Sequence, residues 1–367
     1  MQDLEDRHQD RTSTTQGKQG RCLHLGVLGL GPNWQVWRRV LRRSRSWRVE
    51  VVYDAVQQTA WREATRLGCQ AAESVWQLIA WPGLDGILYC DVQWFGLWPL
   101  EVARIHQARS TSASHPSMNV ATSCGDSKPP RWWCLVPPTV ELSRATQVLE
   151  QIIGSDLQVH FVWPEWEIVM GRIRSHQVRQ RLGTTRWMEV QVITTLQNAS
   201  AQGLVGQSVQ VRAYHAWCGA LLCLSHLTGE LAEEVHGLGK LQDEYVEYHT
   251  LAARFPTAGW ACIETVIFTD NTASHFAAET RREHLTTFLA RPCQLRILGT
   301  AGQLSYCGPD WLDWYLRRWH VREHWKLPRS LEEYLLQRWR RQWLSRESTS
   351  ETNRHLQHYC ALLQSLR

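Results

Sequence analysis

Two glycines in residues 24–41, HLGVLGLGPNWQVWRRVL, have the spacing of a turn that can hold a phosphate. Gly29 and Gly31 follow a short apolar run and precede an apolar pattern of helical period. In such a turn the first glycine permits the bend, and the second lets the backbone approach a pyrophosphate at the helix N-terminus. Asp54 ends a second apolar run 25 residues after Gly29, where a carboxylate can bind ribose hydroxyls. Together these residues predict a dinucleotide-binding site.

The residues within and after the glycine pair belong to the same predicted cofactor site. They are Leu30, Pro32, Asn33 and Trp34. Pro32 is compatible with the first turn of a helix, where its missing N–H costs no hydrogen bond. Trp34 stands where a small residue usually allows close packing, so it either packs under the helix or points into the pocket. Its helical spacing to Trp37 and Leu41 favours packing under the helix.

The simplest alternative for the whole motif is an α/β turn that needs glycine for its geometry and binds nothing. The order of strand, turn, helix, strand and acidic residue favours the binding interpretation. Asp54 is followed by Ala55 and not by a basic residue, which favours NAD over NADP.

Strands and helices alternate around this turn, and the alternation predicts a doubly wound parallel sheet, a Rossmann domain. Strands are expected at residues 22–28, 49–53, 85–91 and 132–136. Helices are expected from residue 34 onward and at 59–67, 74–81 and 142–153. Residues 109–130 are rich in Ser, Thr, Gly and Pro and are interpreted as a loop insertion.

The second half of the sequence predicts a second domain, which the strand at 158–163 is expected to open. Later strands are expected at residues 188–196, 235–242, 245–254, 260–268 and 293–299, and helices at 168–183, 216–229, 331–344 and 353–367. Since most of these strands follow one another without a helix, we expect a large, mostly antiparallel open sheet in an α/β domain. The domains are therefore a disordered tail (1–21), a Rossmann domain (22–157) and a sheet domain with C-terminal helices (158–367).

The composition excludes several classes of protein. The chain has 367 residues and a net charge of +5, too weak a charge to indicate nucleic-acid binding. Its 11 cysteines form no Cys-x-x-Cys pair, which favours a reducing compartment. The N-terminus lacks an apolar signal segment, and no apolar run is long enough to span a bilayer. We therefore expect a cytoplasmic protein with no membrane partner. The 21 tryptophans against 6 phenylalanines are interpreted mainly as core residues.

Two further patterns have competing interpretations. Arginine and tryptophan interleave at residues 316–326 and 337–344, as on a nucleic-acid or anionic-membrane surface. An amphipathic helix with tryptophan inward and arginine outward is favoured instead, because acidic residues lie nearby. His355, His358 and Cys360 could take a metal in principle, but the spacing is weak, and no metal site is predicted.

The order of the motifs resembles the Gfo/Idh/MocA family of NAD(P)-dependent oxidoreductases. The matching segments are residues 26–34, 51–54, 84–91, 132–149, 181–183 and 295–306, the last with the Gly-Thr-x-Gly turn LRILGTAGQLSY. The resemblance extends over about residues 23–367 and is thin between the motifs. It implies a sugar or polyol substrate, a site between the two domains, and a homo-oligomer formed through the C-terminal sheet.

The chain departs from the family at the positions that perform catalysis. Pro137 stands in place of the lysine of the family's Glu-Lys-Pro segment, and a proline cannot polarise a hydroxyl. In the second domain the family's catalytic histidine aligns with Gly219 and its aspartate with Leu222. Asp91-Val92 replaces the Thr-Pro that usually ends the strand beside the nicotinamide.

No residue is a clear replacement for the missing base. His226 lies four residues after Leu222, on the same helix face, and is the one weak catalytic candidate. The competing interpretation is a histidine that simply ends a helix. The sequence thus leaves three hypotheses: a divergent oxidoreductase with a relocated base, a catalytically inactive pseudo-oxidoreductase serving as a cofactor-binding or protein-interaction module, and a structural protein whose pocket Trp34 has closed.

Overall fold

The computed structural model describes most of the chain, in two compact units. It describes residues 21–31, 34–91, 95–112, 130–135, 142–195, 209–242, 246–268, 293–307, 311–324, 330–345 and 349–366. The first unit comprises the described residues of Met1–Val136, Ile152–Phe161 and Glu332–Ser350, and the second those of Pro137–Gln151, Val162–Leu331 and Glu351–Arg367. The domain limits derived from the sequence stay predictions, and nearly all of the expected tail at 1–21 lies outside the described residues.

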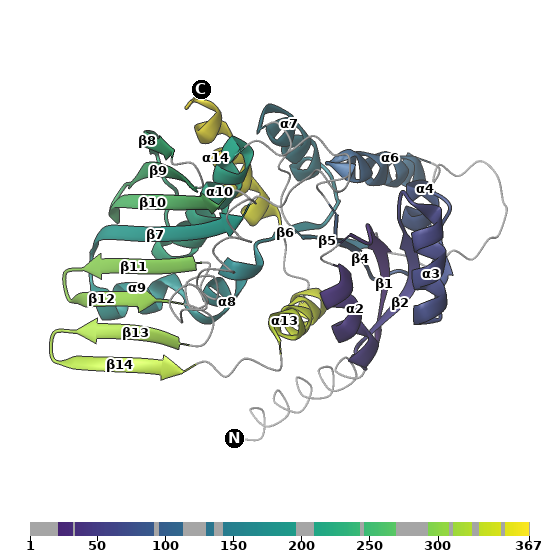
Figure 1. Ribbon diagram of the computed structural model, residues 1–367, viewed down its shortest axis with the longest axis horizontal. Coiled ribbons are helices and arrows are strands. Elements are labelled where there is room, and N and C mark those ends of the chain that lie inside the picture. The colour runs from purple at the N-terminus through teal and green to yellow at the C-terminus, as the bar shows by residue number, and fades with distance from the viewer. Residues whose placement is uncertain are drawn as a thin grey trace, which may run out of the picture. The chain divides into compact units, whose positions relative to one another are not determined.

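A six-stranded sheet of order β3-β2-β1-β4-β5-β6 forms the first unit (Figure 1). Its strands are β1 (Leu23–Leu28), β2 (Trp47–Tyr53), β3 (Gln70–Ala71), β4 (Gly86–Tyr89), β5 (Arg131–Leu135) and β6 (Val159–Val162). The pairs β1–β2, β1–β4, β2–β3 and β4–β5 are all parallel. The order reverses between β1 and β4, which is the topological switch point of a Rossmann sheet. The predicted fold class is confirmed here.

The helices of this region begin and end where local chemistry requires. They are α2 (Trp34–Arg43), α3 (Gln57–Leu67), α4 (Val75–Ile79), α6 (Trp98–Ser112) and α13 (Leu331–Ser345), whereas most of α7 (Leu142–Ile153) belongs to the second unit. Helix α3 ends at Gly68, whose φ of 69° is left-handed and suits glycine. Ser74 caps α4 because its side chain accepts the N–H of Gln77 at 3.1 Å. Helix α6 extends into the predicted loop at 109–130, of which residues 113–129 lie outside the described part.

Tryptophans build much of the core of the first unit. The indole of Trp37 stacks on that of Trp339 with centroids 5.1 Å apart, and Trp339 stacks on Trp133 at 5.7 Å. Trp47 meets Trp133 edge-on at 5.5 Å. All four are buried, so helices α2 and α13 are joined to strands β2 and β5 by indole packing. In α13, Trp339 is buried and Arg341 exposed, as an amphipathic helix at 337–344 requires.

The second unit contains an eight-stranded sheet of order β14-β13-β12-β11-β7-β10-β9-β8. Its strands are β7 (Thr185–Thr195), β8 (Glu234–Gln242), β9 (Val246–Phe255), β10 (Gly259–Phe268), β11 (Cys293–Gly299), β12 (Gly302–Tyr306), β13 (Trp311–Leu316) and β14 (Trp319–His324). Among the described pairs only β7–β10 is parallel, which confirms the predicted, mostly antiparallel sheet.

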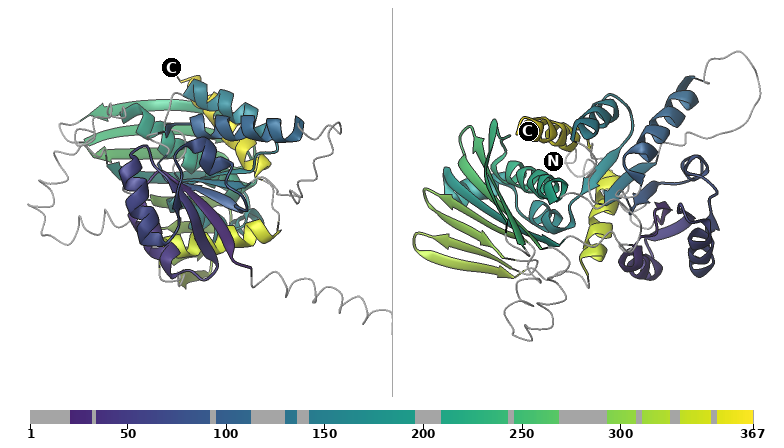
Figure 2. Two further views of the ribbon diagram at one scale, coloured as in Figure 1. Left: turned by 90° about the vertical axis from the view of Figure 1, so that its right-hand side faces the viewer. Right: turned by 45° about the horizontal axis from the view of Figure 1, so that its top comes forward.

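The two faces of this sheet differ. Its helices are α8 (Pro164–Arg172), α9 (Ser175–Leu182), α10 (Val209–Thr228) and α14 (Ser350–Gln364). In β7 the residues Met188 and Val190 are buried on the face toward α10, whereas Trp187 and Glu189 alternate onto the exposed face. Figure 2 shows these helices gathered on one face of the sheet. Among the described helices, none is long and apolar enough to cross a membrane.

Two sequence-based predictions about elements are wrong. The strand expected to open the second domain is β6, and it lies at the edge of the first sheet, where Trp132 donates its N–H to the carbonyl of Gln158 at 2.8 Å. The stretch at 316–326 is not an amphipathic helix, because it contains the turn of the β13–β14 hairpin. Arg322 makes two hydrogen bonds to Asp313 across that hairpin, at 2.7 and 3.0 Å, so its charge is held within the sheet.

Candidate functional site

The predicted cofactor turn lies at the switch point of the first sheet. Gly29 and Gly31 follow β1, and Asp91 follows β4. Leu28 of β1 pairs with Tyr89 of β4, so the carboxyl ends of the two strands meet at one edge. In open parallel sheets this edge is where ligands bind. The turn and Asp91 are therefore neighbours for a topological reason that does not depend on any ligand.

Gly29 is required by the fold itself. Its φ of 81° lies in the left-handed region that other residues avoid. A Cβ on Gly29 would lie 2.5 Å from the Cβ of Asp91 and 3.0 Å from its backbone nitrogen. Its N–H also donates to the carbonyl of Tyr53 at 2.9 Å. This glycine would be needed even in a turn that binds nothing.

Gly31 is different, because the backbone does not demand a glycine there. The φ angle of Gly31 does not lie in the positive, left-handed range. A Cβ on Gly31 would meet the Oδ2 of Asp91 at 2.8 Å and its Cγ at 3.3 Å. These atoms are the end of a side chain that can rotate away. A ligand that must approach the main chain closely gives a physical reason for glycine at this position.

Asp54 braces the turn from the end of β2. Its Oδ2 accepts the N–H of Leu30 at 2.7 Å, and its Oδ1 accepts the N–H of Val56 at 2.8 Å. An ionised carboxylate can accept about four hydrogen bonds, so these two leave capacity for ribose hydroxyls. The predicted acidic residue thus lies beside the predicted turn. Pro32 and Asn33 lie outside the described residues.

Trp34 packs beneath helix α2. It is 1% exposed, and its Nε1–H donates to the Oε2 of Glu63 at 3.1 Å. The other Glu63 oxygen accepts from Arg38 at 2.8 Å and Arg66 at 2.6 Å. Burial raises the pKa of Glu63, but the hydrogen bonds from Trp34 and Arg66 and the charges of both arginines outweigh it and lower that pKa overall. The indole is therefore a core residue held in place by an ionised carboxylate.

The described residues fit a dinucleotide unevenly. Asp54 can accept ribose hydroxyls, and Gly31 lets a ligand reach the main chain. Asp91, however, places a carboxylate within 2.8 Å of the point where a Cβ of Gly31 would lie. The residues described at this turn therefore fit a nucleoside, whereas the side chain of Asp91 partly occupies the space that a phosphate beside Gly31 would take.

The catalytic positions of the second unit are filled by packing. A Cβ on Gly219 would lie 2.5 Å from Cδ1 of Trp163, so this indole occupies the space of any side chain at that position. Leu222 is buried. The Nε2 of His226 lies 3.0 Å from the carbonyl oxygen of Ile173, which can only accept, so Nε2 carries the proton. Pro137 and Val92 lie outside the described residues.

Glu247 and His249 form a buried pair that the sequence analysis missed. The Nε2 of His249 lies 3.2 Å from Oε2 of Glu247, and both side chains are less than a tenth exposed. The imidazole meets the ring of Trp217 edge-on at 6.3 Å. Strand alternation was the available signal, since positions 247 and 249 share the buried face with Leu251. A histidine paired with a carboxylate can hold and move a proton.

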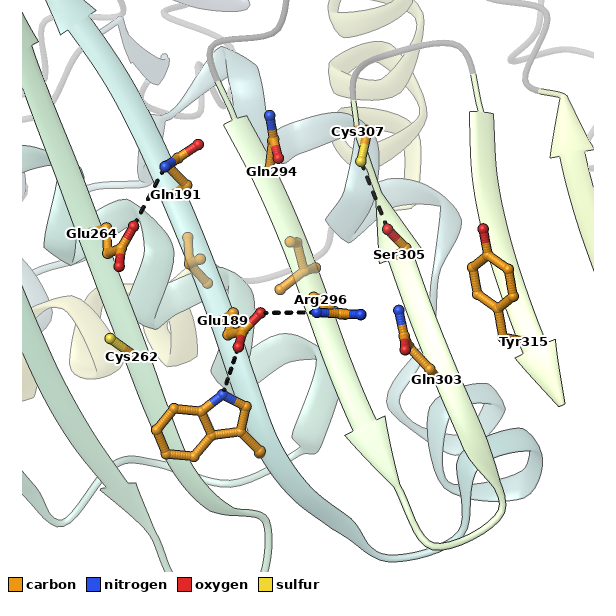
Figure 3. Close-up of a pocket in the computed structure, with 13 residues that line it drawn as sticks. Glu189, Gln191, Cys262, Glu264, Gln294, Arg296, Gln303, Ser305, Cys307 and Tyr315 are labelled. Carbon is orange, nitrogen blue, oxygen red and sulfur yellow. Dashed lines mark hydrogen bonds and ion pairs between the residues drawn. The ribbon is translucent and has the colours of Figure 1, made fainter. Parts of the chain in front are cut away.

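The exposed face of the second sheet carries a polar hollow of about 790 Å³ (Figure 3). Its side chains pair with one another across the strands. Arg296 lies 3.6 Å from Glu189, which also accepts the Nε1–H of Trp187 at 3.1 Å. Gln191 donates to Glu264 at 3.4 Å. The hollow therefore presents both charges and amides on a broad, open surface.

Two of the residues that could in principle take a metal, His358 and Cys360, have other partners. Nε2 of His358 lies 2.7 Å from the carbonyl oxygen of Ala232. A hydrogen bond with Cys360 and burial together raise the pKa of the Cys218 thiol. Within the described part of the chain, no group of three or more His, Cys, Asp or Glu side chains could hold a metal ion.

Solved structures with the same fold are oxidoreductases. An oxidoreductase from Agrobacterium radiobacter in complex with NAD+, L-tartaric acid and magnesium is 12% identical, with a TM-score of 0.65 over 93% of this chain and 94% of that one. UDP-N-acetylglucosamine 3-dehydrogenase from Acidithiobacillus ferrooxidans is 15% identical, with a TM-score of 0.63 over 94% and 97%. Biliverdin reductase from Synechocystis, in complex with biliverdin and NADP+, is 13% identical, with a TM-score of 0.61 over 94% and 98%.

These similarities establish the fold of the chain as that of two-domain NAD(P)-dependent oxidoreductases. No protein-family model matches the sequence, and no curated protein matches it either. At 10–15% identity the shared fold does not carry over any residue's role. The chemistry of this chain has to be argued from its own site.

Proposed function

We propose that the chain is a divergent member of the Gfo/Idh/MocA-like oxidoreductases that binds NAD(P) at the glycine turn, with NAD favoured. The observation that carries this proposal is Gly31. The fold explains Gly29 and brings Asp54 to the turn, but it leaves Gly31 without a conformational reason. The proposed cofactor-binding residues are Gly29, Leu30, Gly31, Pro32, Asn33, Trp34 and Asp54, of which Trp34 acts from beneath by positioning α2.

The substrate we propose is a sugar-like polyol. A bound nicotinamide would supply the hydride acceptor or donor, and the protein would have to supply the proton transfer. His226 is the sequence-based candidate for that proton transfer, and the buried pair Glu247–His249 is a second group able to hold a proton. One solved structure with this fold contains glycerol and another tartaric acid, which supports a hydroxylated ligand.

The alternative is an inactive pseudo-oxidoreductase that keeps the fold as a cofactor-binding or protein-interaction module. The packing of Trp163 against Gly219 favours it, since that position has no room for the missing histidine. Cofactor binding without turnover of reduced nicotinamide over a panel of sugars and polyols would support this alternative. Turnover of any of them would support the oxidoreductase.

Calorimetric titration with NAD+, NADH, NADP+ and NADPH tests the cofactor proposal. We expect binding by the wild-type chain and none by Gly31→Arg, because a long side chain would cover the main chain that the ligand must approach. Gly237→Arg is the matched control: position 237 is exposed and a Cβ there meets nothing within 4 Å, so the same charge is added without a backbone clash. Unchanged affinity in Gly31→Arg would place the site elsewhere.

We further propose that the exposed face of the second sheet binds a second copy of the chain. Trp187 and Trp260 are register partners on adjacent strands and are 37% and 38% exposed. Glu189 and Arg296 give the same face both charges, so two copies can match opposite charges across a two-fold axis. Trp260→Arg should shift the sedimentation of the protein to that of a monomer. A wild-type monomer at all concentrations would exclude this interface.

The free thiols support a reducing compartment. All ten described cysteines are unpaired by disulfides, and burial raises the pKa of several of them, such as Cys134 and Cys223. We therefore propose that the protein resides in the cytoplasm. Recovery of the tagged protein in a secreted fraction would contradict this placement.

A further inference from the structure

We propose that the acidic N-terminal segment, residues 3–10, covers an arginine face on helix α2 and keeps other polyanions from it. The arginine face is defined by four exposed side chains of α2 and the loop after it: Arg39, Arg42, Arg43 and Arg45. This inference is independent of the proposed nucleotide binding. The arginine face extends from the middle of α2 to beyond its last residue, whereas the glycine turn precedes its first.

The arginine face carries charge that the described part of the chain does not balance. Residues 34–48 contain six arginines and no acidic residue. Arg38 is paired with Glu63 at 2.8 Å. Arg48 is paired with Glu50 at 3.1 Å. The other four form the arginine face, and their side chains make no hydrogen bond or ion pair with any described residue. Uncompensated positive charges this close together attract an anionic partner.

The packing of α2 directs these side chains outward. Its buried side chains all lie on one face: Trp34, Trp37 and Leu41. With 3.6 residues per turn, Arg39 and Arg43 lie one turn apart on the opposite face. The helix dipole favours arginine in the last turn, at positions 42 and 43, but it does not account for Arg39 in the middle of the helix. An anion over the outer face of α2 gives a reason for the whole arginine face.

The chain enters this unit beside the arginine face. The guanidinium of Arg21 donates to the Oδ1 of Asp85 at 2.7 Å, which fixes the start of the described chain. Two residues later, the N–H of Leu23 donates to the carbonyl of Ser46 at 2.9 Å, in the loop that carries Arg45. The part of the chain that contains the N-terminal segment is therefore joined to the unit next to the arginine face.

The N-terminal segment has the charge and the reach to cover this face. Residues 3–10, DLEDRHQD, hold four acidic residues and one arginine, which gives a net charge of −3 with histidine neutral. Asp10 precedes Arg21 by 11 residues, which span up to about 36 Å when extended. The ten residues of α2 span about 15 Å. A carboxylate can accept two N–H groups of one guanidinium, so the segment can occupy the sites that other polyanions would bind.

Modification of arginine by phenylglyoxal, mapped by mass spectrometry on the full chain, tests the cover. The neutralised-segment variant combines Asp3→Asn, Glu5→Gln and Asp6→Asn, which keep the length of the segment and remove three of its charges. We expect the arginine face to react at least about threefold faster in this variant than in wild type, because the attraction holding the segment is lost. Arg186, exposed in the second unit, is the internal reference and should react equally in both.

The matched control for this experiment combines Glu73→Gln, Glu150→Gln and Asp156→Asn. These substitutions remove the same charge at three exposed positions outside the segment. The arginine face should stay as protected in the control as in wild type. Equal reaction rates in wild type and the neutralised-segment variant would overturn the proposal. Equally faster rates in the control and the neutralised-segment variant would also overturn it, because the effect would then come from net charge alone.

Polyanion binding tests whether the segment shields the face. At about 50 mM salt the neutralised-segment variant should bind fluorescein-labelled heparin about tenfold more tightly than wild type. Adding Arg42→Gln, Arg43→Gln and Arg45→Gln should abolish this gain. No gain in heparin affinity would overturn the shielding.

Poly(U) and phosphatidylserine vesicles distinguish other occupants of the arginine face. If wild type binds either probe as tightly as the neutralised-segment variant does, and through the same arginines, the face belongs to that partner and the proposal is overturned. Titration with NAD+ keeps this inference separate from the proposed function. Failure of wild type to bind NAD+, with the protection by the segment intact, would refute the cofactor site and leave the role of the segment standing.

Discussion

The molecule contains two turns with a pair of glycines each, and the atoms that pack against the glycines differ between them. In the first, Gly29 and Gly31 follow β1, and only Gly29 is fixed by the backbone. In the second, which joins β11 to β12, a Cβ on Gly299 would lie 2.3 Å from the carbonyl oxygen of Leu182. A Cβ on Gly302 would lie 2.5 Å from the carbonyl oxygen of Tyr315. Both glycines of the second turn are therefore required by main-chain packing.

The difference shows what a sequence motif can and cannot indicate. The second turn forms main-chain hydrogen bonds with residues 182 and 184, in and directly after the segment 181–183 that also matches the family. The N–H of Ala301 donates to the carbonyl of Leu182 at 2.8 Å, and the N–H of Thr300 donates to the carbonyl of Thr184 at 3.0 Å. Two motifs of the family resemblance are thus one packing arrangement, which identifies a fold and says nothing about chemistry. Gly31 is the motif glycine that neither backbone conformation nor main-chain packing explains, and for that reason it points to a ligand.

Substitution by alanine should separate the two turns with the largest effect. We expect Gly299→Ala to lower the free energy of unfolding by about 3 kcal/mol, since the backbone oxygen of Leu182 cannot move aside without disturbing α9. Gly31→Ala should cost less than about 1 kcal/mol, because the Asp91 carboxylate can rotate. Urea unfolding followed by circular dichroism measures both.

Gly237→Ala serves as the control for that comparison, because its Cβ would meet no atom within 4 Å. It should behave like Gly31→Ala. Equal and large losses at positions 31 and 299 would show that the first turn is as tightly packed as the second, and Gly31 would no longer indicate a ligand.

Much of the fold could be predicted from the sequence, for physical reasons. The spacing of apolar residues and the positions of glycines are local features of the sequence. The strands and helices around Gly29 and Gly68 could therefore be anticipated. The hairpin at 311–324 could not be anticipated, because interleaved Arg and Trp residues fit a helix equally well. What stabilises the hairpin includes the bond of Arg322 to Asp313 on the adjacent strand, which the sequence does not reveal. Strand β6 was expected to open the second domain, and its place in the first sheet depends on pairing with β5, which is also distant in the sequence.

Within the site, the contacts that decide function are between segments far apart in sequence. Asp91 could be identified as a departure from the family pattern, but its approach to Gly31 depends on the pairing of β1 with β4. Trp34 was rightly favoured as a core residue by its spacing, whereas its hydrogen bond to Glu63 of α3 has no signature in the sequence. The pair Glu247–His249 was visible only as alternation on a strand.

A smaller effect on the free energy of unfolding should show which interactions stabilise each turn. The first depends on an ionised group, since Glu63 of α3 bonds Trp34 and Arg38 of α2 and Arg66 in the last turn of α3. Glu63→Gln should cost about 2 kcal/mol at neutral pH, as expected for hydrogen bonds to a buried charge. The folded pKa of Glu63 is lowered, so its contribution is present above its unfolded value near 4.5 and is lost as the pH falls through the folded pKa.

Urea unfolding of wild type and Glu63→Gln from neutral to acidic pH measures this dependence. The two unfolding free energies should converge below about pH 4.5, where the carboxyl of the unfolded chain takes up its proton. Gly299→Ala should keep its deficit over the same range, because main-chain contacts do not titrate. A constant difference between wild type and Glu63→Gln would mean that the charge of Glu63 does not support the first turn.

The smallest expected effect concerns a side-chain bond of the second turn, in which Oγ1 of Thr300 accepts the N–H of Thr184 at 3.2 Å. Thr300→Val keeps the shape and removes the acceptor, and at an exposed site it should cost about 0.5 kcal/mol by urea unfolding. Thr300→Ser keeps the oxygen and is the control. Neither variant should alter nucleotide binding, because this turn belongs to the second unit and is required for packing. A loss of nucleotide affinity in Thr300→Val, with Thr300→Ser unaffected, would mean that the second turn also contributes to the ligand site, and the contrast between the two turns would fail.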